Sequence, residues 1–142
     1  MSRYNIEIAK GAGFCFGVKR AVQIAEKTAD ENGGCCTLGE LIHNGSEIAR
    51  LERLGVYPIN SPEDLPDGKT LIIRSHGVAQ SVIDHINDKG INCIDATCPF
   101  VAKIHDIVSK AEGHVIVAGD PDHPEVIGIV GHCKDPNEVT VV

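Results

Sequence analysis

Aromatic residues and positive charge are both scarce in this 142-residue sequence. Trp is absent and aromatics make up only 4% of the chain, so a packed core must be aliphatic. Acidic residues outnumber basic ones, and the formal net charge is −7. Because binders of nucleic acids and anionic membranes need a basic face, this charge argues against both partners. It does not exclude a small anion, which a few His and Lys residues and helix amino-termini can hold in one cleft.

The sequence also lacks the marks of export and of membrane insertion. Its start, MSRYNIEIAKGAGF, has no apolar core segment behind a basic end, as a secretory signal would. No apolar run approaches the roughly 20 residues that a membrane span requires. We therefore expect a cytoplasmic protein with neither a membrane nor a nucleic-acid partner.

Cysteine, by contrast, is abundant for a chain expected in a reducing compartment. The six cysteines are Cys15, Cys35, Cys36, Cys93, Cys98 and Cys133. Three disulfides are disfavoured, because the compartment is reducing and the chain is long enough to build its own core. Metal binding or catalysis is the better account of at least some of these thiols.

Apolar patterning alternates between strand-like and helix-like segments. Strands are predicted over residues 5–9, 35–38, 56–59, 70–73, 91–94, 114–118 and 138–142. Helices are predicted over residues 18–31, 46–54, 79–89, 100–111 and 124–130, the second with Ser46 as its amino-cap. The apolar strands 70–73 and 114–118 are expected to be buried on both faces. This alternation predicts a three-layer α/β fold with a parallel sheet.

Two structural units follow from this order of elements. We expect a first α/β domain over residues 1–96 and an incomplete second α/β domain over residues 97–142. The second unit has two predicted strands and stops on the apolar run 139–142 without a closing helix. Because a parallel sheet normally has helices on both faces, we expect an interrupted domain.

Two cysteines occupy the same setting, a junction from a strand to a helix. Cys15 lies among Gly11, Gly13 and Gly17, and Cys98 precedes Pro99 at a helix start. The helix dipole and free N–H groups stabilise a thiolate in such a place. The alternative is a buried apolar Cys in a turn, which is common. Two thiolates are too few for an ordinary iron–sulfur cluster, and they do not form a CxxC zinc knuckle.

Histidines follow other strand ends, on the edge where parallel sheets bind ligands. His43 and His76 are each placed to donate to an anion, and two such side chains suit a diphosphate. Each could instead hydrogen-bond a loop carbonyl. Glu125, in His123-Pro124-Glu125, could deliver protons if burial raised its pKa, or it could be a surface Glu favoured by the helix dipole. The remaining histidines are interpreted as surface or structural: His85, His105, His114 and His132.

The motifs together resemble those of the LytB or IspH family, the 4-hydroxy-3-methylbut-2-enyl diphosphate reductases. The matching segments, in order, are Gly13-Phe14-Cys15-Phe16-Gly17-Val18 with Arg20-Ala21, Ile42-His43-Asn44, Ser75-His76-Gly77-Val78, Asp95-Ala96-Thr97-Cys98-Pro99 and His123-Pro124-Glu125-Val126. Their order and spacing cover essentially the whole chain.

This resemblance implies a specific reaction and a specific cofactor. The family removes the allylic hydroxyl of its diphosphate substrate, yielding isopentenyl and dimethylallyl diphosphate in the last step of the non-mevalonate (MEP/DOXP) isoprenoid pathway. Its [4Fe–4S] cluster is held by three cysteines, and ferredoxin or flavodoxin supplies the electrons. Its fold is a trefoil of three α/β domains around a central cavity.

The resemblance also assigns roles to residues of this chain. Cys15 and Cys98 match cluster ligands, His43, His76 and His123 match the substrate-binding histidines, and Glu125 matches the proton-relay acid. The third cluster cysteine is expected beyond residue 142, so the chain is expected to be an amino-terminal fragment that is inactive alone. The alternative is a short diphosphate-binding or regulatory module without redox activity.

Overall fold

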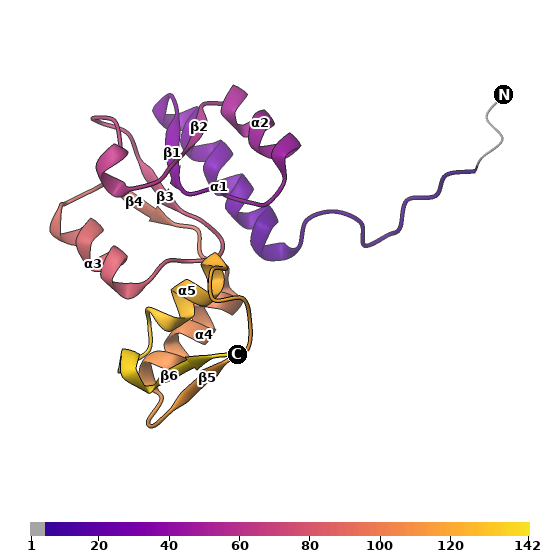
Figure 1. Ribbon diagram of the computed structural model, residues 1–142. Helices are drawn as coiled ribbons and strands as arrows, with labels where there is room; N and C mark the ends of the chain where they lie inside the picture. Colours follow the sequence, from indigo (N-terminus) through magenta and orange to yellow (C-terminus); the bar gives the residue numbers. More distant parts are fainter. Residues whose placement is uncertain (1–4) are drawn as a thin grey trace.

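The computed structural model describes residues 5–142 and contains two separate parallel sheets. The first sheet has the strand order β2-β1-β3-β4, and the second pairs β5 with β6 (Figure 1). Strands run Cys35–Leu38 (β1), Val56–Ile59 (β2), Leu71–Ile73 (β3), Cys93–Asp95 (β4), Val115–Val117 (β5) and Val139–Val141 (β6). The predicted α/β class with parallel strands is confirmed.

Helices connect the strands throughout. The α-helices span Phe16–Asn32 (α1), Gly45–Arg53 (α2), Gln80–Asp88 (α3), Pro99–Lys110 (α4) and Pro124–Val130 (α5). Two short 3₁₀ helices cover Pro62–Asp64 and Pro136–Glu138. Most boundaries lie within a residue or two of the predicted ones, which is the usual uncertainty of helix ends. No helix within residues 5–142 is long and apolar enough to cross a membrane.

The first sheet is buried on both faces because its strand residues alternate between two apolar clusters. Cys35 and Ile72 point to a cluster formed with α1 and α2. Cys36, Leu71 and Ile73 point to the opposite cluster, formed with α3. The result is the predicted three-layer arrangement, with its sheet between helices on either side.

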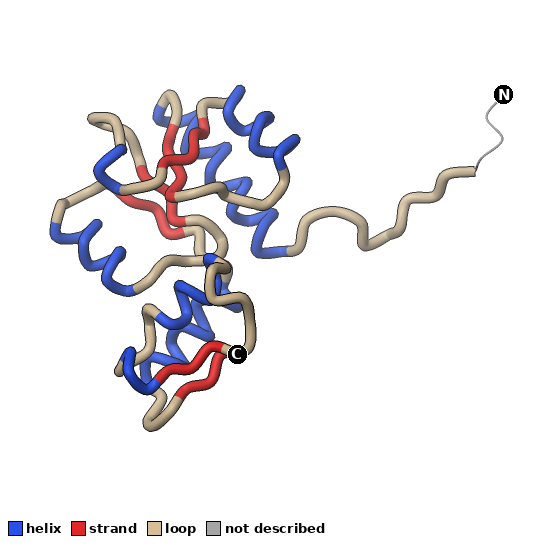
Figure 2. Tube along the Cα trace, viewed as in Figure 1, coloured by secondary structure: helices blue, strands red, loops and turns tan. Residues whose placement is uncertain are grey.

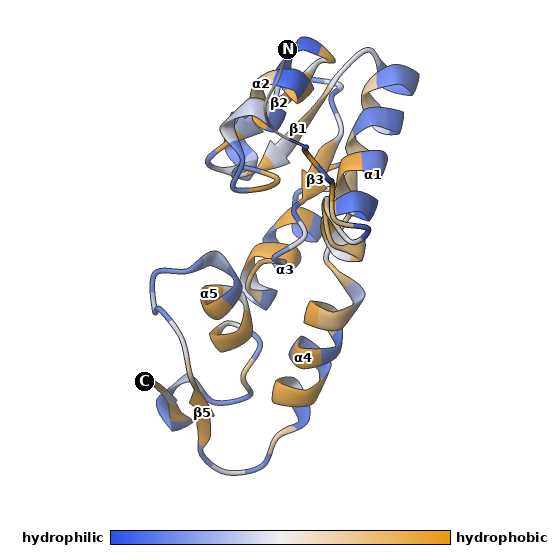
Figure 3. Cartoon of the chain, turned by 90° about the vertical axis from the view of Figure 1, so that its right-hand side faces the viewer, coloured by the Kyte–Doolittle hydropathy of each residue, from blue (hydrophilic) through white to orange (hydrophobic). Residues whose placement is uncertain are grey.

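The second sheet has a core of its own, formed with α4 and α5. Val108, Val117, Val126 and Ile129 are its buried residues, and hydrophobic residues recur along both helices (Figure 3). The prediction that strand 114–118 is buried on both faces is wrong, because Ile116 of β5 is 69% exposed. Both helices pack on the other face of this sheet. The boundary predicted between residues 96 and 97 lies between β4 and α4 and stays a prediction.

The amino-terminal segment departs most from expectation. Residues 5–9 form no strand, and Ile6 and Ile8 are each 84% exposed. The segment runs away from both sheets as an extended trace (Figure 2). An alternating pattern makes a strand only where a neighbouring strand completes its backbone hydrogen bonds, and no described strand lies beside it.

Candidate functional site

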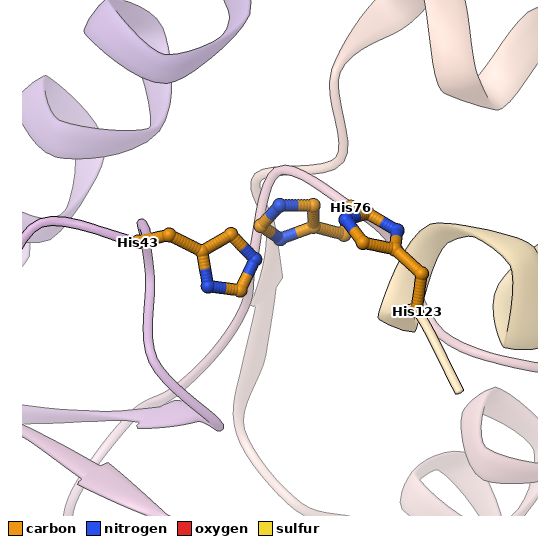
Figure 4. Close-up of side chains that lie close together, drawn as sticks. All are labelled: His43, His76 and His123. Carbon is orange, nitrogen blue, oxygen red and sulfur yellow. The ribbon is translucent and has the colours of Figure 1, made fainter. Parts of the chain in front are cut away.

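Three histidines from distant parts of the chain form one cluster. His43 follows β1, His76 follows β3, and His123 is the amino-cap of α5. Their ring centroids are 4.9 Å apart for His43–His76, 5.9 Å for His43–His123 and 5.7 Å for His76–His123. The rings converge in one place (Figure 4), with a ligating nitrogen of each within 4.8 Å of the others.

Local sequence fixes the backbone beneath each ring. Asn44 caps α2 by accepting a hydrogen bond from the Glu47 N–H at 3.1 Å, which sets the turn that presents His43. Gly77 has φ +71°, a conformation that favours glycine, and its N–H donates to the Arg74 carbonyl at 3.0 Å to close the turn around His76. His123 Nδ1 accepts from the Glu125 N–H at 3.2 Å, which orients that ring.

His76 is the electrostatic centre of the cluster. Burial, assisted by the neighbouring charges of Arg74, His43 and His123, lowers its pKa to about 4. Its Nδ1 is buried without a hydrogen-bond partner, and so is Nε of Arg74. Unsatisfied buried polar atoms are costly. An anion in the cluster would both accept hydrogen bonds and favour the charged form of His76.

Arg74 is the site residue that sequence reasoning missed. It lies two positions before His76 in the chain, and burial lowers the pKa of its guanidinium while Glu40 opposes that effect. The sequence does carry a signal for this role: Arg74 is a cationic residue directly after the all-apolar strand β3. Three imidazoles are also a plausible ligand set for a divalent metal, but the Arg74 charge would repel a metal cation and attract an anion.

The two cysteines expected to ligate metal lie at helix amino-termini that meet. Cys15 is the amino-cap of α1 and Cys98 that of α4, and neither side chain makes a capping hydrogen bond. A Cβ at Gly17 would lie only 2.5 Å from Cys98 Sγ, so the start of α1 lies against that sulfur. Arg20 Nη1 donates to the Thr97 carbonyl at 3.3 Å, which joins α1 to the segment before Cys98.

Backbone contact also links Cys98 to the histidines. The Cys98 N–H donates to the carbonyl of Ser75 at 2.9 Å, so Cys98 and His76 lie on adjoining loops. The chain therefore brings Cys98, the start of α1 and the imidazole cluster to one region.

The other cysteines are poor candidates for metal ligands. Burial raises the pKa of Cys35 to about 11, assisted by Cys36, and raises the pKa of Cys36 itself. Burial likewise raises the pKa values of Cys93 and Cys133. Because a metal ligand must be a thiolate, Cys15 and Cys98 are the better fit, as an exposed and a half-buried free thiol at helix starts.

Glu125 joins this region through its backbone. It lies in the first turn of α5, and its N–H makes the hydrogen bond to His123 described above. Its carboxylate is not part of the three-histidine cluster. The structure therefore places Glu125 beside the histidines without assigning it a proton-transfer role.

Comparison with known proteins places the chain in one family. The family model described as "LytB protein" matches residues 6–142. A 4-hydroxy-3-methylbut-2-enyl diphosphate reductase of Clostridioides difficile is 46% identical over 135 residues, covering 92% of this chain and 48% of the relative. The reductase of the same name from Aquifex aeolicus is 45% identical, covering 97% of this chain and 49% of the relative.

Solved structures agree in fold. One, described as (E)-4-hydroxy-3-methyl-but-2-enyl diphosphate reductase, the terminal enzyme of the non-mevalonate pathway, superposes with a TM-score of 0.82 at 44% identity, covering 96% of this chain and 50% of that one. The E-1-hydroxy-2-methyl-but-2-enyl-4-diphosphate reductase from Plasmodium falciparum gives a TM-score of 0.86 at 31% identity, covering 94% and 42%. The chain spans about half the length of the curated relatives it matches.

Proposed function

This chain belongs to the LytB protein family, and we propose that it supplies the first domain and part of the second of a 4-hydroxy-3-methylbut-2-enyl diphosphate reductase. The observation that carries the proposal is the imidazole cluster with Arg74 beside it, next to two thiols at meeting helix starts. The first set suits a diphosphate and the second suits part of a metal centre. This pairing is what a reductive dehydroxylation of an allylic diphosphate requires.

His43, His76 and His123 bind the diphosphate of the substrate in this proposal. Their nitrogens converge from three elements, and the unpartnered Nδ1 of His76 is satisfied by a phosphate oxygen. The positive charge of the half-buried Arg74 further favours an anion beside them. The allylic end of the substrate then extends toward the cysteines.

Cys15 and Cys98 would hold two irons of a [4Fe–4S] cluster, with the third cysteine ligand expected beyond residue 142. The Gly17 contact fits such a group, since any side chain there would displace the Cys98 sulfur. When bound, the cluster supplies two electrons and a Lewis-acidic iron for the departing hydroxyl. Ferredoxin or flavodoxin is the proposed electron donor. Glu125, beside His123, would supply the proton with which the hydroxyl leaves as water, and a second proton, from solvent or the substrate diphosphate, would complete the reduced allylic carbon.

The experiment is anaerobic expression of the complete reading frame that contains this chain, with iron and sulfide counted and turnover measured. We expect a brown protein that loses iron in Cys15→Ser and Cys98→Ser and keeps it in the matched control Cys133→Ser. His43→Gln and His76→Gln are expected to raise KM, and Glu125→Gln to lower kcat. A complete protein that stays colourless and inactive would contradict the proposal. If the reading frame stops at Val142 and the protein it encodes still binds pyrophosphate, the diphosphate-binding module is favoured instead.

A further inference from the structure

One histidine outside the cluster, His105 of α4, is almost fully buried between the elements that carry two of the site histidines. Its side chain is 7% exposed, and its Nε2 has no hydrogen-bond partner. Sequence reasoning interpreted it as surface or structural. The proposed function does not use it, so its burial needs another explanation.

His105 touches the loop of His76 on one side. A Cβ at Gly77 would lie 2.5 Å from His105 Cε1, so the ring lies directly against the Gly77 backbone. Gly77 also has φ +71°. Gly77 therefore sets the shape of the turn that presents His76, through its φ angle, and the position of that turn, through its contact with His105.

His105 also touches the helix that begins with His123. A Cβ at Gly128 of α5 would lie 3.3 Å from His105 Nε2 and 3.5 Å from the His76 carbonyl oxygen. Glycine at this position lets three elements approach one another: α4, α5 and the loop after β3. Since His123 caps the same helix, a shift of His105 would change the spacing between His76 and His123.

His132 holds this arrangement from the far end of α5. Its ring stacks on His105 with centroids 4.0 Å apart and planes 17° from parallel. Its Nε2 donates to the Val78 carbonyl at 3.0 Å, since a carbonyl can only accept. The Gln80 N–H donates to the Gly131 carbonyl at 3.2 Å beside it. The stack thus ties the end of α5 to α4, and the two hydrogen bonds tie it to the segment that follows His76.

We propose that His105 is a positioning residue for diphosphate binding, which sets the spacing of His76 and His123 by packing between Gly77 and Gly128, with His132 locking its ring. The inference rests on the proposed role of the histidine cluster. Burial and the charge of His132 lower the pKa of His105 to about 4, against the opposing effect of Asp95. The ring is therefore a neutral spacer at neutral pH, which agrees with its unpartnered nitrogen.

The test uses the protein encoded by the complete reading frame, with steady-state kinetics and pyrophosphate binding by calorimetry. His105→Ala is expected to raise KM and the pyrophosphate Kd by about tenfold with kcat little changed. His132→Ala, at a half-buried position, is expected to have a smaller effect in the same direction, about threefold. The matched control His114→Ala, at an exposed position just before β5 where the ring hydrogen-bonds Thr140, is expected to bind as wild type.

A double-mutant cycle separates positioning from a general loss of stability. The effect of His105→Ala is expected to shrink in a His76→Gln background and to persist in a His43→Gln background, because His43 lies on an element that His105 does not brace. Equal effects in the two backgrounds, or a His105→Ala protein that binds like His114→Ala, would overturn the inference. If His105→Ala does not fold, the same comparison is made with His132→Ala in the His76→Gln and His43→Gln backgrounds, and equal effects on pyrophosphate binding would overturn the inference. If His43→Gln, His76→Gln and His123→Gln all leave binding unchanged, the proposed function of the cluster itself fails.

Discussion

At the scale of single residues, the site holds basic side chains whose surroundings disfavour their charged forms: the pKa values of His76 and Arg74 are both lowered. Burial, together with the nearby Arg74 and two other histidines, lowers the pKa of His76, so its neutral form dominates in the free protein. A bound diphosphate would shift this balance toward the imidazolium, because its negative charge favours the charged form. The residue therefore responds to the ligand it is proposed to bind.

His76 predicts a dependence of stability on pH. Its pKa is about 4 in the folded protein and 6.5 ordinarily, so between those values the unfolded chain binds a proton that the folded chain does not. The free energy of unfolding therefore falls as the pH drops from 6.5 toward 4 and is insensitive to this group above 6.5. His105, with its pKa also lowered to about 4, acts in the same direction. Urea unfolding at a series of pH values is expected to show that the free energy of unfolding of His76→Gln falls less steeply between pH 6.5 and 4 than that of the wild type. The same dependence on pH in both proteins would contradict this.

Gly17 predicts a steric effect on the sulfur pair. In Gly17→Ala the new Cβ would meet Cys98 Sγ at 2.5 Å and Cys98 Cβ at 2.9 Å. We expect a loss of about 1–3 kcal/mol from overpacking and a lower iron content in the complete protein. Gly45→Ala is the control, because it also adds a methyl group at a helix start but meets nothing within 4 Å. Equal iron contents in the two variants would show that the Gly17 contact does not matter for the thiols.

At the scale of elements, helix starts carry most of the site. Cys15, Cys98 and His123 are all amino-caps, of α1, α4 and α5, and His43 immediately precedes the amino-cap of α2. These positions expose free N–H groups and the positive end of a helix dipole. Such ends favour both thiolates and phosphates, so helix amino-termini suit the cysteines as well as the histidine cluster.

The start of α2 gives a test of this arrangement. The sequence predicted Ser46 as the amino-cap, and that prediction is wrong: Asn44 accepts the Glu47 N–H, and Ser46 lies inside the helix. Asn44→Ala is expected to cost about 1 kcal/mol of stability and to weaken pyrophosphate binding by loosening His43. Ser46→Ala is expected to change stability by less than about 0.5 kcal/mol. Thermal unfolding of the two variants checks the order, and a larger loss in Ser46→Ala would reverse the assignment.

At the scale of the whole molecule, the histidine cluster joins two sheets that share no strand pairing. His43 and His76 extend from the first sheet, and His123 belongs to a helix packed on the second. A ligand held by all three would therefore link the two halves. Ligands that bind the folded state stabilise it by mass action.

Pyrophosphate is accordingly expected to stabilise the complete protein. At about 100 times its Kd it should raise the free energy of unfolding by about 2.7 kcal/mol, and the His123→Gln protein should lose that shift at the same ligand concentration. Differential scanning calorimetry measures both, with inorganic phosphate at matched ionic strength as the control. A full shift in His123→Gln would show that the second sheet takes no part in binding.

Sequence by itself determined the parallel α/β class, nearly every helix and strand, the strand ends that carry Cys98, His43 and His76, and the helix start at Cys15, although no strand precedes Cys15 as predicted. These features depend on apolar periodicity and on residues next to helix starts, both of which are local. The strand predicted over residues 5–9 was wrong because strand formation depends on a neighbouring strand, and the full burial predicted for β5 was wrong because only one face of its sheet is covered.

Only the tertiary structure decided which side chains meet. The approach of His123 to His43 and the stack of His105 on His132 join residues far apart in the chain. Packing of α4 and α5 against the loop after β3 sets those distances, and no local pattern encodes them. The same packing lowers the pKa values of His76 and His105, since burial and neighbouring charge exist only once the chain has folded.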